Sequence, residues 1–167
     1  GVGMVVCRVV PAAALDRVET AVPVRPGWEA LRISRGRLAA GDFLKGLGLS
    51  VAPFEDVPDA SAFRAAVAKI GAPSILKTRR FGYDGKGQAR LRSPKDAEQA
   101  YADMQDAPAI LEGFVDFTHE VSVIAARSVT GEVACFDPGE NVQRNGILHT
   151  TTVPARLSVA QRTDAVL

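Results

Sequence analysis

Two lysines and three glycines lie close together in the middle of this chain. Lys77 ends an apolar run, and Lys86 lies in a basic turn that also contains Gly82, Gly85 and Gly87. A glycine-rich backbone can fold closely around a ligand, and its exposed N–H groups suit a polyphosphate, as ammonium groups do. The pattern favours phosphate binding for Lys77 over a lysine that only reaches out to water. Lys86 taken alone is more typical of a solvated loop.

A second group of candidate residues surrounds a glycine that should end a strand. Gly113 follows Glu112, and a strand broken there would leave a backbone N–H and C=O exposed to the edge of a flat heterocycle. Phe114 or Val115 would then form an apolar wall, although a plain strand end with Phe114 in the core fits the same pattern. Glu120 lies on the polar side of the next strand, where it either faces solvent or accepts hydrogen bonds from ribose hydroxyls.

Polar residues also gather beyond residue 138. Gln143 is flanked by Glu140–Asn141 and Arg144–Asn145, a cluster too polar for a core and typical of a surface loop or a site loop. His119 and His149 have no serine or cysteine at the spacing of a nucleophilic triad. No carboxylates have the spacing of a metal site, so the sequence predicts no metal ligands within this chain.

The overall composition is that of a globular protein. The chain has 167 residues, of which 47% are hydrophobic and 23% charged. A net charge of +1 predicts neither a nucleic-acid nor a membrane partner, and no apolar run approaches the roughly 20 residues of a membrane helix. We interpret Cys7 and Cys135 as buried or inert thiols of a cytoplasmic protein, with a disulfide as the alternative.

The elements that must position these residues alternate between strands and helices. Pro23, Pro26 and Gly27 indicate a linker after a short helix over 12–20. We expect helices over 34–47, from 59 or 61 to 70, from 93 to 104, and from 157 onward. We expect a short extended piece over 51–54 and strands over 1–10, 74–78, 88–91, 109–112, 119–127, 133–136 and 146–153, several of them in antiparallel hairpins. Together they predict an α+β fold.

The motifs in this order resemble one enzyme family. The segment from Lys77 to Gln88 is similar to the glycine-rich loop of the N5-carboxyaminoimidazole ribonucleotide synthetases, which are ATP-grasp ligases of purine biosynthesis. The segment from Glu112 to Phe117, with Glu120, resembles the family's hinge and ribose segment. The resemblance implies a partial ATP-grasp fold over 28–167, with a lid lobe at about 72–118, after a remnant and linker over 1–27.

The resemblance also implies roles for individual residues. ATP would be bound with its phosphates at Lys77 and the glycine loop, its adenine at the 112–115 segment and its ribose at Glu120. Arg37 falls on an ATP-contacting arginine, and Gln143 takes the place of the family's site-loop histidine. The nucleotide-binding residues implied are Arg37, Lys77, Gly82, Tyr83, Asp84, Gly85, Lys86, Gly87, Gln88, Glu112, Gly113, Phe114, Val115, Glu120 and Gln143.

The sequence also departs from the family. Arg8-Val9 replaces an acidic–asparagine pair, and the neighbours of Arg37 differ at Arg35-Gly36 and Ala40-Gly41. The family's amino-terminal domain and the carboxy-terminal segment that binds Mg²⁺ have no counterpart here. The implied Mg²⁺ ligands therefore lie outside this chain, and we expect the isolated chain not to turn over.

The function that the resemblance implies is a ligase reaction. ATP and bicarbonate would form carboxyphosphate, which would carboxylate 5-aminoimidazole ribonucleotide. Two alternatives remain at this point. One is another carboxyphosphate-forming ATP-grasp ligase, and the other is a truncated or decayed homologue that binds nucleotide weakly without turnover. Members of the family often form dimers, so a homodimer is also expected.

Overall fold

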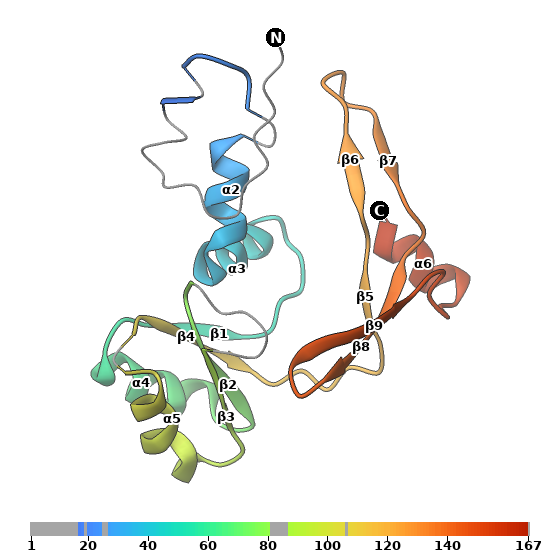
Figure 1. Cartoon of the computed structure of the whole chain (residues 1–167). Helices are drawn as coiled ribbons and strands as arrows, with labels where there is room; N and C mark the ends of the chain where they lie inside the picture. Colours follow the sequence, from blue (N-terminus) through green and yellow to red (C-terminus); the bar gives the residue numbers. More distant parts are fainter. Residues whose placement is uncertain (1–16, 19, 25–26, 81–86, 106, 167) are drawn as a thin grey trace. The chain divides into compact units, whose positions relative to one another are not determined.

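The structure, a computed structural model, describes residues 17–18, 20–24, 27–80, 87–105 and 107–166 (Figure 1). The chain divides into two compact units. Of the described residues, the first unit comprises those from 17 to 80 and from 87 to 114, and the second comprises 115–166. The expected strand over 1–10 and Cys7 lie outside the described residues, as does most of the expected helix over 12–20.

The first unit is built on a four-stranded antiparallel sheet. Its strands are β1 (Phe54–Val57), β4 (Ala109–Gly113), β2 (Ser74–Thr78) and β3 (Gln88–Leu91), in the order β1-β4-β2-β3. The three strands predicted over 74–78, 88–91 and 109–112 are confirmed. The segment 51–54, predicted as a short extended piece, leads into β1, which begins at Phe54.

The two faces of this sheet have different characters because strand side chains alternate. On one face Leu76, Leu91 and Leu111 are fully buried. They pack with Phe63 and Ala66 of α4 (Ala60–Ile70), and with Ala100 of α5 (Ala97–Asp103). Figure 1 shows α4 and α5 on this side of the sheet. The opposite face, called the charged face below, carries Asp56, Lys77, Arg90 and Glu112 together with Ile75 and the buried Ile110.

Local capping explains where the core helices begin. The Asp59 carboxylate accepts the backbone N–H of Ala62 at 2.8 Å, so α4 starts at Ala60. A 3₁₀ turn, η1 (Pro94–Asp96), precedes α5 and carries a capping box between Ser93 and Asp96. The helices predicted up to residue 70 and from 93 to 104 are confirmed.

The helix predicted over 34–47 is wrong in its bounds. Two helices occupy this region, α2 (Trp28–Arg35) and α3 (Arg37–Gly46), and Gly36 between them has extended dihedral angles of −115° and 115°. Glycine destabilises a helix because it loses more backbone freedom than any other residue, and here it marks the break. In α3, a Cβ added at Gly41 would lie 2.8 Å from the Phe54 ring, so this glycine permits close packing on β1.

The second unit contains two small sheets. One is β5 (Glu120–Ser122), β8 (Gly139–Arg144) and β9 (Ile147–Thr152) in the order β5-β8-β9, and the other pairs β6 (Ala125–Arg127) with β7 (Val133–Cys135). The helix α6 (Val159–Val166) follows. The hairpin between residues 125 and 135 and the strand over 146–153 are confirmed.

Two predictions for the second unit are wrong. The strand expected over 119–127 is two strands in different sheets: β5 pairs with β8, and β6 pairs with β7. The alternation of polar and apolar side chains continues through both strands, so it does not predict the break between them. The polar cluster expected to be a loop is strand β8, which pairs with β9 through Asn145 and Gly146 at positive φ. Asn-Gly is the strongest short hairpin signal, and it outweighs the polar character of the strand.

Cys135 is free and exposed, so of the two predicted alternatives a buried thiol is wrong, and an inert thiol stays a prediction. Among the described residues, no helix is both long enough and apolar enough to cross a membrane.

Candidate functional site

Lys77 and Glu112 meet on the charged face of the four-stranded sheet. Glu112 pairs with Ile75 in the ladder between β2 and β4, and Lys77 lies two residues beyond Ile75 on the same face. The Lys77 ammonium and the Glu112 carboxylate form an ion pair. The two side chains are only 23% and 22% exposed, so most of each is withdrawn from solvent. Two residues that the sequence analysis assigned to different parts of a nucleotide are therefore direct neighbours.

This arrangement orients the Lys77 ammonium. A carboxylate beside it limits the rotamers of the long side chain, and the ammonium keeps two further N–H donors for a ligand. A polyphosphate brought to this face would interact with a cation that is already positioned, at less entropic cost than with a free surface lysine.

Arg37 lies at the end of the strand that carries Lys77. Its Nη1 donates to the backbone C=O of Thr78 at 2.5 Å, and its backbone N–H donates to the C=O of Arg79 at 3.2 Å. An arginine has five N–H donors, so this contact leaves most of the guanidinium available to an anion. The structure thus brings Arg37 within one residue of Lys77 along β2.

Gly87 and Gln88 begin the strand that pairs with Lys77. The backbone N–H of Thr78 donates to the C=O of Gly87 at 2.8 Å, and Gln88 lies directly opposite Lys77. Gly87 has a φ of +68°, and a Cβ there would lie 2.6 Å from Thr78 Oγ1. Only glycine tolerates both conditions. The other predicted loop residues, Gly82, Tyr83, Asp84, Gly85 and Lys86, lie outside the described residues.

The strand end at Gly113 differs from the prediction. The Gly113 N–H donates to the C=O of Pro53 at 2.8 Å, and the Phe114 N–H donates to the C=O of Pro73 at 3.1 Å. Both N–H groups are occupied within the protein, so the expectation that the glycine break exposes a free N–H is wrong at these two residues. A Cβ at Gly113 would lie 2.8 Å from Pro53, which explains the requirement for glycine.

Phe114 is on the surface and not in the core. It is 37% exposed, and the Arg90 guanidinium lies 4.3 Å from the centroid of its ring. Arg90 pairs with Ile75 in the ladder, so it shares the charged face with Lys77 and Glu112. The sequence analysis missed Arg90, although its spacing of two from Gln88 places both on one face. Val115 is 48% exposed and belongs to the second unit.

In the second unit, Glu120 and Gln143 form a polar network with Asn141. Glu120 Oε1 accepts from Gln143 Nε2 at 2.9 Å and from Asn141 Nδ2 at 3.3 Å. Asn141 Oδ1 in turn accepts from Thr151 Oγ1 at 2.8 Å. Glu120, Asn141 and Thr151 are ladder partners across β5, β8 and β9, so the register of the strands builds this network. The sequence analysis placed Asn141 in the polar cluster around Gln143 but gave it no role in nucleotide binding.

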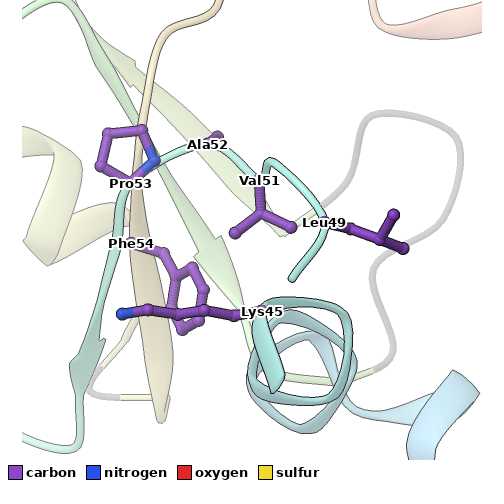
Figure 2. Close-up of a pocket in the computed structure, with 6 residues that line it drawn as sticks. All are labelled: Lys45, Leu49, Val51, Ala52, Pro53 and Phe54. Atoms are coloured by element: carbon purple, nitrogen blue, oxygen red, sulfur yellow. The ribbon is translucent and has the colours of Figure 1, made fainter. Parts of the chain in front are cut away.

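A shallow pocket in the first unit lies apart from the predicted residues. It has a volume of about 250 Å³ and is lined by Lys45, Leu49, Val51, Ala52, Pro53 and Phe54. Figure 2 shows these side chains around the segment that joins α3 to β1. None of the residues assigned to nucleotide binding lines this pocket, so we do not place the site there.

The described residues contain no group of three or more histidine, cysteine or acidic side chains that could hold a metal ion. The charged face can therefore supply cations and hydrogen-bond donors to an anionic ligand, but within the described residues it offers no metal centre.

Several curated proteins are similar to this chain. It is 49% identical over 152 residues to the N5-carboxyaminoimidazole ribonucleotide synthase of Brucella melitensis, an alignment covering 90% of this chain and 42% of that protein. It is 45% identical over 139 residues to the Pseudomonas aeruginosa protein of the same name, covering 83% and 39% of the two. The chain thus spans about two fifths of the length of these relatives.

Solved structures give the same result for the fold. The ADP complex of an N5-carboxyaminoimidazole ribonucleotide synthetase superposes with a TM-score of 0.90 at 36% identity, over 96% of this chain and 42% of that one. The family model of the ATP-grasp domain matches residues 42–167, which include the whole four-stranded sheet and all of the second unit's strands. The chain therefore belongs to the ATP-grasp family and forms part of an ATP-grasp domain.

Proposed function

We propose that this chain is part of an enzyme that uses ATP and bicarbonate to carboxylate 5-aminoimidazole ribonucleotide. The product would be N5-carboxyaminoimidazole ribonucleotide, an intermediate of purine biosynthesis. The observation that carries the proposal is the 49% identity over 152 residues with the Brucella melitensis synthase. Since the chain spans 42% of that relative, the reaction is proposed for the protein in which this segment acts.

The charged face of the first unit fits the phosphates of ATP. Lys77 is held in place by Glu112, and Arg37 keeps free donors beside the same strand end. Charged donors of this kind stabilise the charge on a phosphoryl group as it is transferred. We propose that Lys77, Arg37, Gln88 and the glycine loop of residues 82–87 bind the phosphates, and that the 112–115 segment lines the adenine.

The polar network of the second unit fits a ribose. Glu120 accepts two amide hydrogen bonds on Oε1, and among the described residues its Oε2 has no hydrogen bond in the structure. A carboxylate oxygen accepts hydrogen bonds from hydroxyl groups. We therefore propose that Glu120 binds the ribose hydroxyls, with Gln143 and Asn141 holding the carboxylate in position.

The proposed chemistry has two steps. The γ-phosphoryl group passes to a bicarbonate oxygen, which forms carboxyphosphate and ADP. The amino nitrogen of the ribonucleotide then attacks the carboxyl carbon, phosphate leaves, and the nitrogen loses a proton. Mg²⁺ would neutralise phosphate charge in such a reaction, but the described residues hold no cluster that fits it, so we assign no residue of this chain to the metal.

The phosphate assignment is tested by titration calorimetry with ATP. We expect Lys77→Ala to raise the dissociation constant of ATP about tenfold or more, because a charge-assisted contact is lost. Lys69→Ala is the matched control, since Lys69 also forms an ion pair, with Glu55 at 2.5 Å, but belongs to the helix side of the unit. An equal affinity in Lys77→Ala and the wild type would contradict the assignment.

The reaction itself is tested in a chimera. The segment of the Brucella melitensis synthase that aligns with this chain is replaced by this chain, and ADP formation is measured. We expect ADP formation to require both bicarbonate and 5-aminoimidazole ribonucleotide. A folded chimera whose ADP formation responds to biotin or an amino acid would favour a different carboxyphosphate-forming ligase. One that binds ATP without forming ADP would favour a homologue without turnover.

We also propose that the protein is a cytoplasmic homodimer, which rests on resemblance to the family. The proposed lid lobe, at about 72–118, rests on the same resemblance. Light scattering of the purified chain would test the dimer, and a monomer at tens of micromolar would contradict it.

A further inference from the structure

The strand end that follows Lys77 is tied to the far side of the sheet. Arg79 lies just beyond β2, and its guanidinium forms an ion pair with Asp56 of β1. Since β4 lies between β2 and β1 in the sheet, the Arg79 side chain passes across the first residue of β4 to reach Asp56. On the way, Arg79 Nε donates to the C=O of Ala109 at 3.5 Å. The side chains of Arg79 and Asp56 are 29% and 40% exposed.

The backbone of the same residue is held as well. The Arg79 N–H donates to the C=O of Pro108 at 2.9 Å, and the Arg79 C=O accepts the N–H of Arg37 at 3.2 Å. The preceding Thr78 bonds to Gly87 through its N–H and to Arg37 through its C=O. Through these contacts, Thr78 and Arg79 connect the end of β2 to β1, to α3, to the start of β4 and to the start of β3.

We propose that Asp56 is a positioning residue for nucleotide binding, which acts by holding Arg79 and so fixing the strand end on which Lys77 lies. This inference rests on the proposed nucleotide site. The alternative, that Arg79 itself binds phosphate, requires its guanidinium to leave Asp56. The geometry favours positioning, because both the side chain and the backbone of Arg79 are bonded toward β4 and β1.

The chain supplies a matched control for Asp56. Glu55 is the neighbouring residue on β1 and forms an ion pair with Lys69 of α4. Because side chains alternate along a strand, Glu55 points to the helix face and Asp56 to the charged face. Both pairs join a cation to a carboxylate, but they lie on different faces of the sheet, and the Lys69 side chain is 71% exposed whereas that of Arg79 is 29% exposed.

The first measurement compares ATP with adenosine, which lacks the phosphates, in Asp56→Asn and Glu55→Gln. We expect Asp56→Asn to raise the dissociation constant of ATP roughly fivefold to tenfold, the size typical of losing a charge-assisted contact. The affinity for adenosine should stay within about twofold. Glu55→Gln should leave both affinities unchanged. A merely structural loss would weaken ATP and adenosine alike, and that result would overturn the proposal.

A double-mutant cycle separates positioning from direct phosphate contact. If Asp56 acts through Arg79, Asp56→Asn combined with Arg79→Ala should weaken ATP binding no more than Arg79→Ala alone. The charge-exchanged variant, Asp56→Arg with Arg79→Asp, should recover part of the affinity. If Asp56→Asn binds ATP as tightly as the wild type or more tightly, while Arg79→Ala binds it weakly, Arg79 contacts phosphate directly and the proposal is wrong.

Amide hydrogen exchange tests the positioning without any nucleotide. We expect the N–H groups of Thr78 and Arg79 to exchange at least about fivefold faster in Asp56→Asn than in Glu55→Gln, because local opening becomes easier. Equal rates would overturn the inference. If exchange responds as expected but the wild type binds no ATP, the proposed function fails while the role of Asp56 in holding the strand end stands.

Discussion

Lys77 shows how a single residue acquires a role from its neighbours across a sheet. The sequence places it at the end of an apolar run, which also fits a lysine that only reaches water. The ladder between β2 and β4 gives it Glu112 as a partner, 35 residues away in the chain. Such long-range pairing leaves no local pattern, so the sequence indicates both residues separately but not their contact.

At the same scale, Ser74 is a polar residue buried on the core face of the four-stranded sheet. It is fully buried at the start of β2, and its hydroxyl has no hydrogen-bond partner among the described residues. A buried hydroxyl without a partner destabilises the folded state. We expect Ser74→Ala to raise the free energy of unfolding by about 1 kcal/mol, measured by urea denaturation.

A contrasting substitution checks this reading. Asp59→Ala removes the side chain that accepts the Ala62 N–H, and it should lower the free energy of unfolding by about 1 kcal/mol. If Ser74→Ala lowers stability as Asp59→Ala does, the Ser74 hydroxyl must have a partner that the described structure does not contain.

At the scale of elements, the start of α5 depends on the ionised form of one carboxyl group. Hydrogen bonds from the backbone N–H groups of Ser93 and Arg92 hold the pKa of Asp96 below its ordinary value of 3.8. Since the folded state favours the carboxylate, its contribution to stability is complete above pH 3.8 and disappears as the pH falls through the lowered pKa.

We therefore expect Asp96→Asn to be less stable than the wild type near pH 7 and equally stable at a pH well below 3.8. Thermal unfolding at several pH values measures the difference. Glu98→Gln, a nearby carboxylate in the first turn of α5, is the control. A difference between Asp96→Asn and the wild type that does not change with pH would show that the charge of Asp96 is not responsible.

Elements were predictable where local chemistry decides them. The sequence predicted the helix start at residue 93 and the strands over 74–78, 88–91 and 109–112. It also offered residues 59 and 61 as alternative helix starts, of which the structure shows the cap at Asp59. The break at Gly36 and the division of residues 119–127 between two sheets were not, because each depends on packing partners far along the chain. Strand β8 was missed because its polar residues pair through the backbone and through the network around Glu120.

At the scale of the whole molecule, the apolar core belongs to one unit. Its buried cluster contains Val57, Phe63, Leu76, Leu91 and Leu111, which all lie in the first unit. In the second unit, Ile124, Val133 and Leu148 are exposed by half or more. The resemblance predicted the fold as a whole correctly, but composition alone carried no information on this uneven distribution.

This distribution predicts independent responses of the two units. We expect Leu76→Ala to destabilise the first unit by about 2–5 kcal/mol, because it leaves a cavity at a fully buried site. Hydrogen exchange followed by mass spectrometry should show faster exchange in β2 and β4, and unchanged exchange in β8 and β9. Equal acceleration in all four strands would mean that the chain unfolds as one cooperative unit.

The alternation along β2 has a consequence for how this protein tolerates insertions and deletions. Leu76 faces the core and Lys77 faces the charged surface, so neighbouring residues serve stability and ligand binding respectively. Deleting or inserting one residue inside Ser74–Thr78 would exchange these faces, turning the ammonium inward and the leucine outward. In a library of single-residue deletions, those within β2 should therefore abolish folding and nucleotide binding together. Point substitutions there should instead affect one property each, stability at Leu76 and nucleotide binding at Lys77.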